Sequence, residues 1–173
     1  MTWNISAGIV GATGYAGVEL VRLLTGHPQA ELTRISSVSF HGKKIPEIYP
    51  GLKGVCDLTL EEGPEAMIED CDVIFASLPH GLSQEIGGAC RERGKAFIDL
   101  GADFRLQDEE TYRAWYGGDF LSAALHQEAV YGLPEIYRER IRHAKLLANP
   151  GCYPTSAALA LYPALKEGLI DPA

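Results

Sequence analysis

The stretch GIVGATGYAG, residues 8–17, decides the fold class, because its glycines are spaced GxxGxxG. It joins a short β-rich run at 6–12 to residues 14–25, whose leucine and valine side chains repeat on one helical face. Glycines between a strand and a helix let the backbone approach a pyrophosphate at the helix N-terminus. This position favours a dinucleotide-binding unit over the alternative, a plain glycine-rich turn.

Strands and helices alternate along the rest of the chain, which implies parallel crossovers. The sequence therefore predicts an α/β fold with a Rossmann-type, doubly wound and mostly parallel sheet. We expect a Rossmann domain over 1–148, and in 149–173 a nucleophile turn with the truncated start of a second, catalytic domain. Strands are expected at 6–12, 30–38, 55–61, 71–79, 95–101 and 144–151, and helices at 14–25, 83–93, 109–116 and 155–167.

Composition narrows the possible partners. The 173 residues carry a net charge of −8, which argues against nucleic acid or an anionic membrane as a partner. No apolar stretch is long enough for a membrane span, and the N-terminus lacks the basic region of a signal peptide. The four cysteines show neither CxxC pairing nor zinc spacing. We therefore expect a cytoplasmic protein with reduced thiols and no metal site.

The end of the second predicted strand indicates which dinucleotide is bound. NAD-binding domains usually carry an acidic residue there, which accepts a hydrogen bond from the ribose 2′-hydroxyl. This chain has Ser36 and Ser37 instead, with Arg34, Lys43 and Lys44 nearby. Hydroxyl and cationic groups suit a 2′-phosphate, so the sequence predicts NADP(H) rather than NAD(H).

The stretch NPGCYPTS, residues 149–156, is the most specific in the chain. Cys152 follows a strand and a Pro-Gly turn, and Pro154 occupies the start of a helix expected from Thr155. The unpaired N–H groups at that helix start would stabilise a thiolate. A buried structural cysteine is the plainer alternative. Of the other cysteines, Cys71 and Cys90 are expected in the core, and Cys56 has no assigned place.

Five motifs in order carry a family resemblance: GIVGATGYAG, SLPHG (77–81), IDLGADFRL (98–106), VYGLPE (130–135) and NPGCYPT (149–155). Across nearly its whole length the chain resembles the N-acetyl-gamma-glutamyl-phosphate reductases of arginine biosynthesis. The resemblance implies that Cys152 forms a thioester with an acyl phosphate substrate, and that NADPH then reduces the thioester to a semialdehyde. It also implies that a general-base histidine and much of the substrate pocket lie beyond residue 173.

The resemblance further assigns cofactor contacts. The implied pyrophosphate contacts are Gly11, Thr13, Gly14, Tyr15, Ala16 and Gly17, with Ser36 and Ser37 near the 2′-phosphate. The implied lining of the nicotinamide cleft is Ser77, Leu78, Pro79, His80 and Gly81, together with the turn at 151–154.

Other polar residues leave two interpretations open. Asp103 and Arg105 could bind a substrate carboxylate or phosphate, or could form an internal ion pair that anchors their loop. His80 could act as a base, although a loop hydrogen bond is favoured. Asn149 is a candidate for substrate binding or for supporting its turn. The remaining histidines lie in polar stretches and are given no role: His27, His41, His126 and His143.

Three alternatives to this function stay open. The chain could be a non-catalytic NADP-binding module. It could belong to the short-chain-dehydrogenase-like enzymes that act on sugar nucleotides, which also carry GxxGxxG and need a Tyr-xxx-Lys pair. It could also be the paralogue that acts on aminoadipyl phosphate in lysine biosynthesis. For any of these enzymes we expect a small-molecule substrate and a homo-oligomer.

Overall fold

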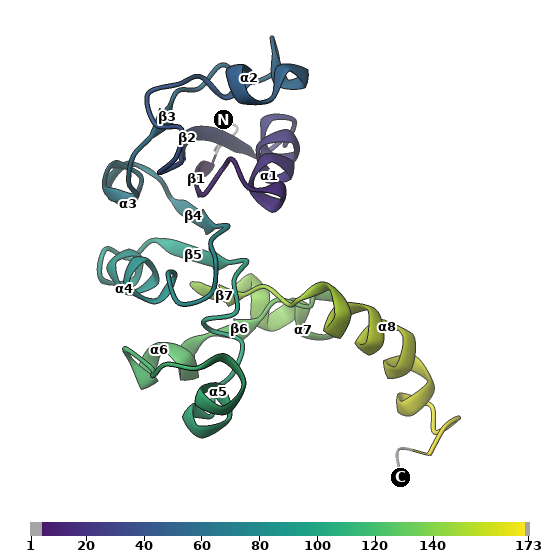
Figure 1. Cartoon of the computed structure of the whole chain (residues 1–173). Coiled ribbons are helices and arrows are strands. Elements are labelled where there is room, and N and C mark those ends of the chain that lie inside the picture. The colour runs from purple at the N-terminus through teal and green to yellow at the C-terminus, as the bar shows by residue number, and fades with distance from the viewer. Residues whose placement is uncertain (1–4, 172–173) are drawn as a thin grey trace.

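A computed structural model describes residues 5–171. Its centre is a seven-stranded sheet in the order β3-β2-β1-β4-β5-β7-β6, in which every neighbouring pair is parallel (Figure 1). The predicted Rossmann-type sheet is thus confirmed. The strands are β1 Ile5–Val10, β2 Ala30–Ser36, β3 Leu60–Glu61, β4 Val73–Ala76, β5 Ala96–Asp99, β6 Val130–Tyr131 and β7 Leu146–Ala148.

Helices connect the strands, and several of them were not predicted. The sequence missed α2, α3, α6, α7 and strand β6, and only two residues of the strand expected at 55–61 form β3. The helices are α1 Tyr15–Thr25, α2 Ile45–Ile48, α3 Glu65–Asp70, α4 Gln84–Glu92, α5 Glu109–Tyr116, α6 Ala123–Glu128, α7 Pro134–Arg142 and α8 Cys152–Lys166, with a 3-10 turn η1 at Pro50–Leu52.

The topology places a switch point between the ends of β1 and β4. From β1 the chain moves outward to β2 and β3 and then returns to pair β4 with the other side of β1. Ligands of open α/β sheets bind at such a switch point, outside the carboxyl ends of the strands. Backbone hydrogen bonds tie the loops along this edge: Ala12 N to Ser36 O (2.9 Å), Ser77 N to Val10 O (2.9 Å), Leu100 N to Ala76 O (2.9 Å) and Asn149 N to Asp99 O (2.8 Å).

Two apolar clusters cover the sheet. Val21 and Leu24 of α1 pack in the cluster on one face, and Met67 of α3 packs in the cluster on the other, where α3 and α4 lie (Figure 1). Three cysteines belong to these clusters. Cys71 and Cys90 are buried in the second cluster, as predicted, and the previously unplaced Cys56 is buried in the first.

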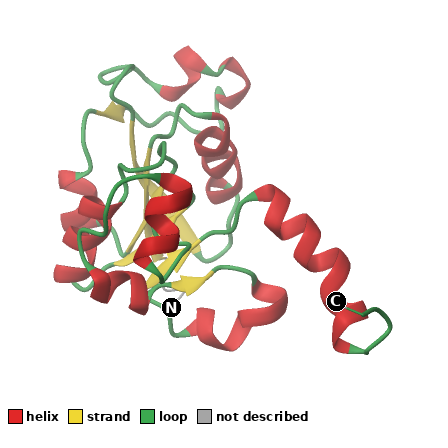
Figure 2. Ribbon diagram, turned by 60° about the horizontal axis from the view of Figure 1, so that its bottom comes forward, coloured by secondary structure: helices red, strands yellow, loops and turns green. Residues whose placement is uncertain are grey.

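Helix α8 has no buried residue and extends away from the sheet (Figures 1 and 2). It begins at Cys152, three residues earlier than the expected start at Thr155, so the cysteine is the first helical residue and not part of the preceding turn. Its large apolar side chains are exposed, including Leu161 at 50% and Tyr153 at 86%.

Candidate active site

The glycine turn combines tight packing with an open helix N-terminus. Gly11 has φ +83°, and a Cβ there would lie 2.3 Å from the Ser77 carbonyl oxygen. A Cβ on Gly17 would lie 2.1 Å from the Gly11 carbonyl oxygen. Gly14, the N-cap of α1, makes no side-chain cap and has only one atom within 4 Å of its would-be Cβ, at 3.6 Å. The unpaired N–H groups of α1 are thus left accessible to an anion.

The end of β2 adjoins this turn. The Thr13 and Ser37 hydroxyls are 2.7 Å apart, and both Ser36 and Ser37 are buried. The Tyr49 hydroxyl donates to the Thr13 carbonyl at 2.6 Å. Sequence reasoning did not identify Tyr49, which lies 36 residues away in the excursion after β2.

Arg34 is not placed as expected. Its guanidinium pairs with Glu61 at 2.6 Å and with Asp70, and hydrogen bonds to these carboxylates raise its pKa. A guanidinium held by two carboxylates is a poor partner for a phosphate dianion. Lys43 and Lys44 remain exposed on the loop after β2.

Asp103 lies behind the loop after β4. It is fully buried and accepts hydrogen bonds from Gly81 N (2.6 Å) and Ser83 N (2.7 Å), while its Oδ1 is 2.7 Å from His80 Nδ1. Both oxygens are occupied by protein donors, so the expected direct contact between Asp103 and a substrate is not supported. Asp103 instead fixes the loop that was predicted to line the nicotinamide cleft.

Both ring nitrogens of His80 have partners. Nδ1 faces Asp103, and Nε2 is 3.5 Å from the Tyr112 hydroxyl. The ring also contacts Tyr116, with centroids 4.9 Å apart. This geometry supports the favoured interpretation of His80 as a loop anchor rather than a base. Burial raises the pKa of Tyr112 to about 12, so its hydroxyl stays protonated beside the imidazole.

A second carboxylate lies next to Asp103. Asp99 ends β5, is fully buried, and accepts from Gly101 N at 2.9 Å and Asp103 N at 3.2 Å. Burial raises the pKa of Asp99, and the negative charge of Asp103 adds to the effect. Asp99 and Asp103 therefore hold the loops at this edge of the sheet by accepting hydrogen bonds from their backbone N–H groups.

Cys152 is the one exposed cysteine among the described residues. It is the first residue of α8 and follows Gly151, an N-cap without a side chain, so it stands at the end of the helix where backbone N–H groups are unpaired. The buried cysteines differ, because burial raises the pKa of Cys71, and that of Cys90 to about 12. The plainer reading of Cys152 as a core cysteine is therefore wrong.

Arg105 supports the cysteine turn. It donates from Nε to the Asn149 carbonyl at 2.9 Å and from Nη2 to the Leu100 carbonyl at 3.0 Å. A Cβ on Gly151 would be 3.1 Å from Arg105 Nη1. The ion pair with Asp103, one of the two interpretations left open by the sequence, is not among the contacts of the described residues, since each side chain anchors a different loop. The Asn149 amide donates to the Pro150 carbonyl at 3.2 Å, a turn contact.

All these elements lie at one edge of the sheet. The glycine turn follows β1, the His80 loop follows the neighbouring β4, and Cys152 follows β7, two strands further on. Two strand spacings place the cysteine turn about 10 Å from the His80 loop. A dinucleotide bound at the switch point could therefore extend from the glycine turn toward the thiol.

His126 also differs from the expectation that it needs no role. It is fully buried, its Nδ1 is 3.1 Å from the Leu106 carbonyl, and its Nε2 is 3.1 Å from the Gln84 amide oxygen. Its ring stacks on Phe120. Burial lowers the pKa of His126. The polar sequence around it gave no sign of this structural role.

Two Tyr-xxx-Lys spacings occur, at 49–53 and 162–166. The Tyr49 hydroxyl is bound to the glycine turn, and Tyr162 lies on the projecting α8 with the Lys166 ammonium 5.9 Å from its ring. Neither provides a free hydroxyl at the switch point, so the short-chain-dehydrogenase alternative loses its support.

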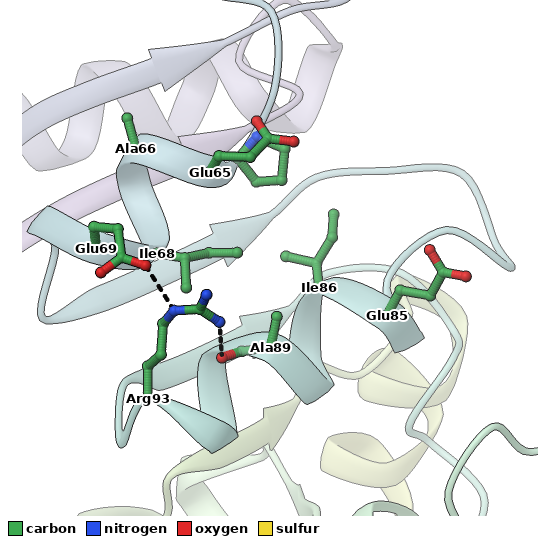
Figure 3. A pocket seen from close by; sticks show the side chains of 9 residues that line it. Glu65, Ala66, Ile68, Glu69, Glu85, Ile86, Ala89 and Arg93 are labelled. Carbon is green, nitrogen blue, oxygen red and sulfur yellow. Dashed lines mark hydrogen bonds and ion pairs between the residues drawn. The ribbon is translucent and has the colours of Figure 1, made fainter.

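A groove of about 490 Å³ lies between α3 and α4 (Figure 3). Ile68 and Ile86 face its interior, and Arg93 pairs with Glu69 at 2.7 Å. Glu65 and Glu85 line it as well, so its charge does not suit the phosphates of a dinucleotide. No group of metal ligands was found in residues 5–171, and no helix of that part is long and apolar enough to cross a membrane.

Known proteins resemble the chain in sequence. Residues 6–144 match the family model described as semialdehyde dehydrogenase, NAD binding domain. N-acetyl-gamma-glutamyl-phosphate reductase of Clostridium botulinum (strain Eklund 17B / Type B) is 52% identical over 97% of this chain and 48% of that protein. The protein of that name from Desulforamulus reducens is 50% identical over 96% of this chain and 49% of its own length. The chain spans about half the length of the curated relatives it matches.

Solved structures share the fold at low identity. Aspartate semialdehyde dehydrogenase with NADP from Candida albicans has a TM-score of 0.64 at 19% identity, and the match covers 95% of this chain and 47% of that chain. Aspartate semialdehyde dehydrogenase II from Vibrio cholerae has a TM-score of 0.61 at 20% identity, over 94% of this chain and 47% of that one. The family match, which spans most of the chain, decides the assignment: the chain belongs to the semialdehyde dehydrogenase NAD-binding domain family.

Proposed function

We propose that this chain is the cofactor- and nucleophile-bearing part of an NADPH-dependent reductase. The reaction converts N-acetyl-glutamyl 5-phosphate to N-acetyl-glutamate 5-semialdehyde and releases phosphate, a step of arginine biosynthesis. The observation that carries the proposal is the exposed Cys152 at a helix N-terminus, on the same sheet edge as the glycine turn. The names of relatives about 50% identical to this chain support the substrate.

The residues at the switch point fit NADP(H). Gly14 leaves the N-terminus of α1 open, and a pyrophosphate there would accept from the backbone of residues 13–17. No acidic residue stands at the end of β2, where Ser36 and Ser37 lie, so this end suits a 2′-phosphate. Lys43 and Lys44 would supply positive charge. A solved structural neighbour contains NADP, which is consistent with this choice. The loop at 77–81 would line the nicotinamide side.

Cys152 would carry the covalent chemistry. Its thiolate attacks the acyl carbon, the bond from that carbon to the phosphate oxygen breaks, and phosphate leaves with the electron pair. NADPH, when bound, would supply the hydride needed to reduce the resulting thioester. The C–S bond then breaks, which releases the aldehyde and regenerates the thiolate. Cys152 begins α8, so the unpaired N–H groups at that end of the helix lie near the negative charge that forms in this reaction.

Further parts of the proposal concern the organisation of the protein. We assign residues 1–148 to the NADP-binding domain and 149–173 to the nucleophile turn and the start of a catalytic domain. The small-molecule substrate would be handled by a cytoplasmic homo-oligomer. The chain by itself is expected to bind cofactor and accept the acyl group without steady-state turnover, because the relatives are twice as long.

The test uses a single acylation. The chain is incubated with N-acetyl-glutamyl phosphate, and released phosphate and peptide masses are measured, with Cys152→Ser and Cys56→Ser as variant and control. We expect the acyl group on Cys152, with phosphate released in equal amount and both lost only in Cys152→Ser. Acylation of a different residue, or none under conditions where NADPH still binds, would contradict the proposed role.

A further inference from the structure

The loop after β4 is held by one carboxylate oxygen that two of its residues share. Asp103 Oδ1 accepts from Gly81 N at 2.6 Å and lies 2.7 Å from His80 Nδ1. Gly81 has φ +90°, so the chain turns sharply between these two donors. An imidazole with its proton on Nδ1 donates to this oxygen, whereas the other tautomer would direct a lone pair at the carboxylate. The shape of the turn therefore depends on how the His80 ring is held.

Tyr112 approaches the other nitrogen of this ring. Its hydroxyl lies 3.5 Å from His80 Nε2, and it is the buried residue of α5. The Tyr112 ring packs edge to face against Phe120 and His126, with centroids 5.1 and 5.6 Å apart. Burial raises the pKa of Tyr112 to about 12, so the hydroxyl keeps its proton. The packing thus holds an O–H group in a fixed place beside Nε2.

Gln84 determines the direction in which the Tyr112 hydroxyl donates. The Gln84 amide oxygen accepts from Leu121 N at 2.9 Å, and its Nε2 donates to the Asp119 carbonyl at 3.2 Å, so backbone groups fix the orientation of the amide. The same Nε2 donates to the Tyr112 oxygen at 3.3 Å. The Tyr112 oxygen is therefore used as an acceptor, and its hydrogen is left for His80 Nε2.

We propose that Tyr112 is a positioning residue for the cofactor. Its hydroxyl, directed by Gln84, holds the His80 ring with Nδ1 on Asp103, and so keeps the His80–Gly81 turn in the shape that receives the nicotinamide end of NADPH. This inference rests on the proposed function, in which the loop at 77–81 lines the nicotinamide side, and adds to it a residue that acts through the loop.

The contacts predict that only one end of the cofactor depends on Tyr112. The His80–Gly81 turn closes the loop at 77–81, whereas Ser77 begins it and packs against Gly11 of the glycine turn. Loss of the Tyr112 hydroxyl should therefore disturb the nicotinamide end and leave the glycine turn, where the pyrophosphate is proposed to bind, in place.

The first measurement is NMR on the chain without cofactor. Long-range proton–nitrogen correlation spectra at about pH 8 report which nitrogen of His80 is protonated. We expect a proton on Nδ1 and none on Nε2, and a shift of the Nε2 resonance in Tyr112→Phe, which removes the hydroxyl and keeps the ring. Tyr116→Phe is the matched control, because the Tyr116 ring contacts His80 but in residues 5–171 its hydroxyl forms no hydrogen bond with the imidazole. A proton on Nε2 alone, or equal effects of the two variants, would overturn the proposal.

The second measurement separates the two ends of the cofactor. NADPH and adenosine 2′,5′-bisphosphate, which lacks the nicotinamide, are titrated by calorimetry into the wild-type chain and both variants. We expect Tyr112→Phe to weaken NADPH binding by about three- to tenfold, as for the loss of one hydrogen bond, and to change binding of the bisphosphate by less than about twofold. Unchanged NADPH affinity, or an equal loss for both ligands, would overturn the proposal.

The outcomes also separate this inference from the proposed function. A wild-type chain that binds neither nucleotide would contradict the proposed function. A wild-type chain that binds both, with Tyr112→Phe indistinguishable from Tyr116→Phe, would contradict only the role of Tyr112. Acylation of Cys152 is tested separately and involves neither tyrosine.

Discussion

Substitutions of Gly17 and Gly14 should have different effects. Gly17→Ala should lower the stability of the fold, whereas Gly14→Ala should lower the affinity for the cofactor. A Cβ on Gly17 would lie 2.1 Å from the Gly11 carbonyl oxygen and 2.8 Å from the Ala12 Cα. Both neighbours are backbone, so α1 must shift away from β1. Overpacking of this kind costs about 3 kcal/mol, and Gly17→Ala should lower the unfolding free energy by that amount. For a domain of this size the loss corresponds to a Tm decrease of about 6–12 °C.

Gly14→Ala is the matched control. Its Cβ would meet only the Gly11 carbonyl oxygen, at an ordinary 3.6 Å, so the cost should stay below about 1 kcal/mol. The same Cβ occupies the space in front of the α1 N-terminus, so NADPH affinity should fall by about tenfold or more. Urea unfolding followed by circular dichroism gives the stabilities, and fluorescence titration gives the affinities. Equal stability losses in the two variants, or unchanged NADPH binding in Gly14→Ala, would refute this reasoning.

Three further results are expected. Under limiting iodoacetamide Cys152 should be alkylated first, as peptide mass mapping would show, because the other cysteines are buried; slowest labelling of Cys152 would contradict its role. NADPH should bind more tightly than NADH by about tenfold, and Ser37→Asp should reverse this preference by repelling the 2′-phosphate; equal affinities in calorimetry would oppose the NADP assignment. Burial raises the pKa of Asp99 above its ordinary value of 3.8, so between 3.8 and the raised pKa the folded protein keeps a proton that the unfolded chain has lost. The free energy of unfolding should therefore fall as the pH rises between these two values. Urea midpoints across pH should show this slope reduced in Asp99→Asn, and an unchanged slope would oppose it.

Local sequence predicted the parts of the fold that depend on local periodicity. The glycine turn, the helix after it and the apolar strand near residues 71–79 were all identified, because glycine spacing and apolar runs encode them directly. Helix α7 was missed because its sequence PEIYRERIR is mostly charged and buries no residue. Strand β6 has two residues, too few to show a period.

The sequence predicted at which edge of the sheet the candidate residues lie, but not which residues they contact. Cys152 and the serines of β2 lie at the expected edge, since strand ends determine this edge. The Arg34 pairs with Glu61 and Asp70 span 27 and 36 residues, and no spacing rule reveals them. For Asp103 the sequence left ligand binding and loop anchoring open, because a carboxylate within a loop can do either; its side chain faces inward and anchors the neighbouring loop.

The unsupported position of α8 makes the chemistry of Cys152 depend on helix formation. An isolated helix of fifteen residues is marginally stable in water, and α8 also contains Pro163. Whenever its first turn unwinds, Cys152 is no longer held at the start of a helix with unpaired backbone N–H groups. Amide hydrogen exchange in α8 and the alkylation rate of Cys152 should therefore vary together, so a contact that immobilises α8 would change both.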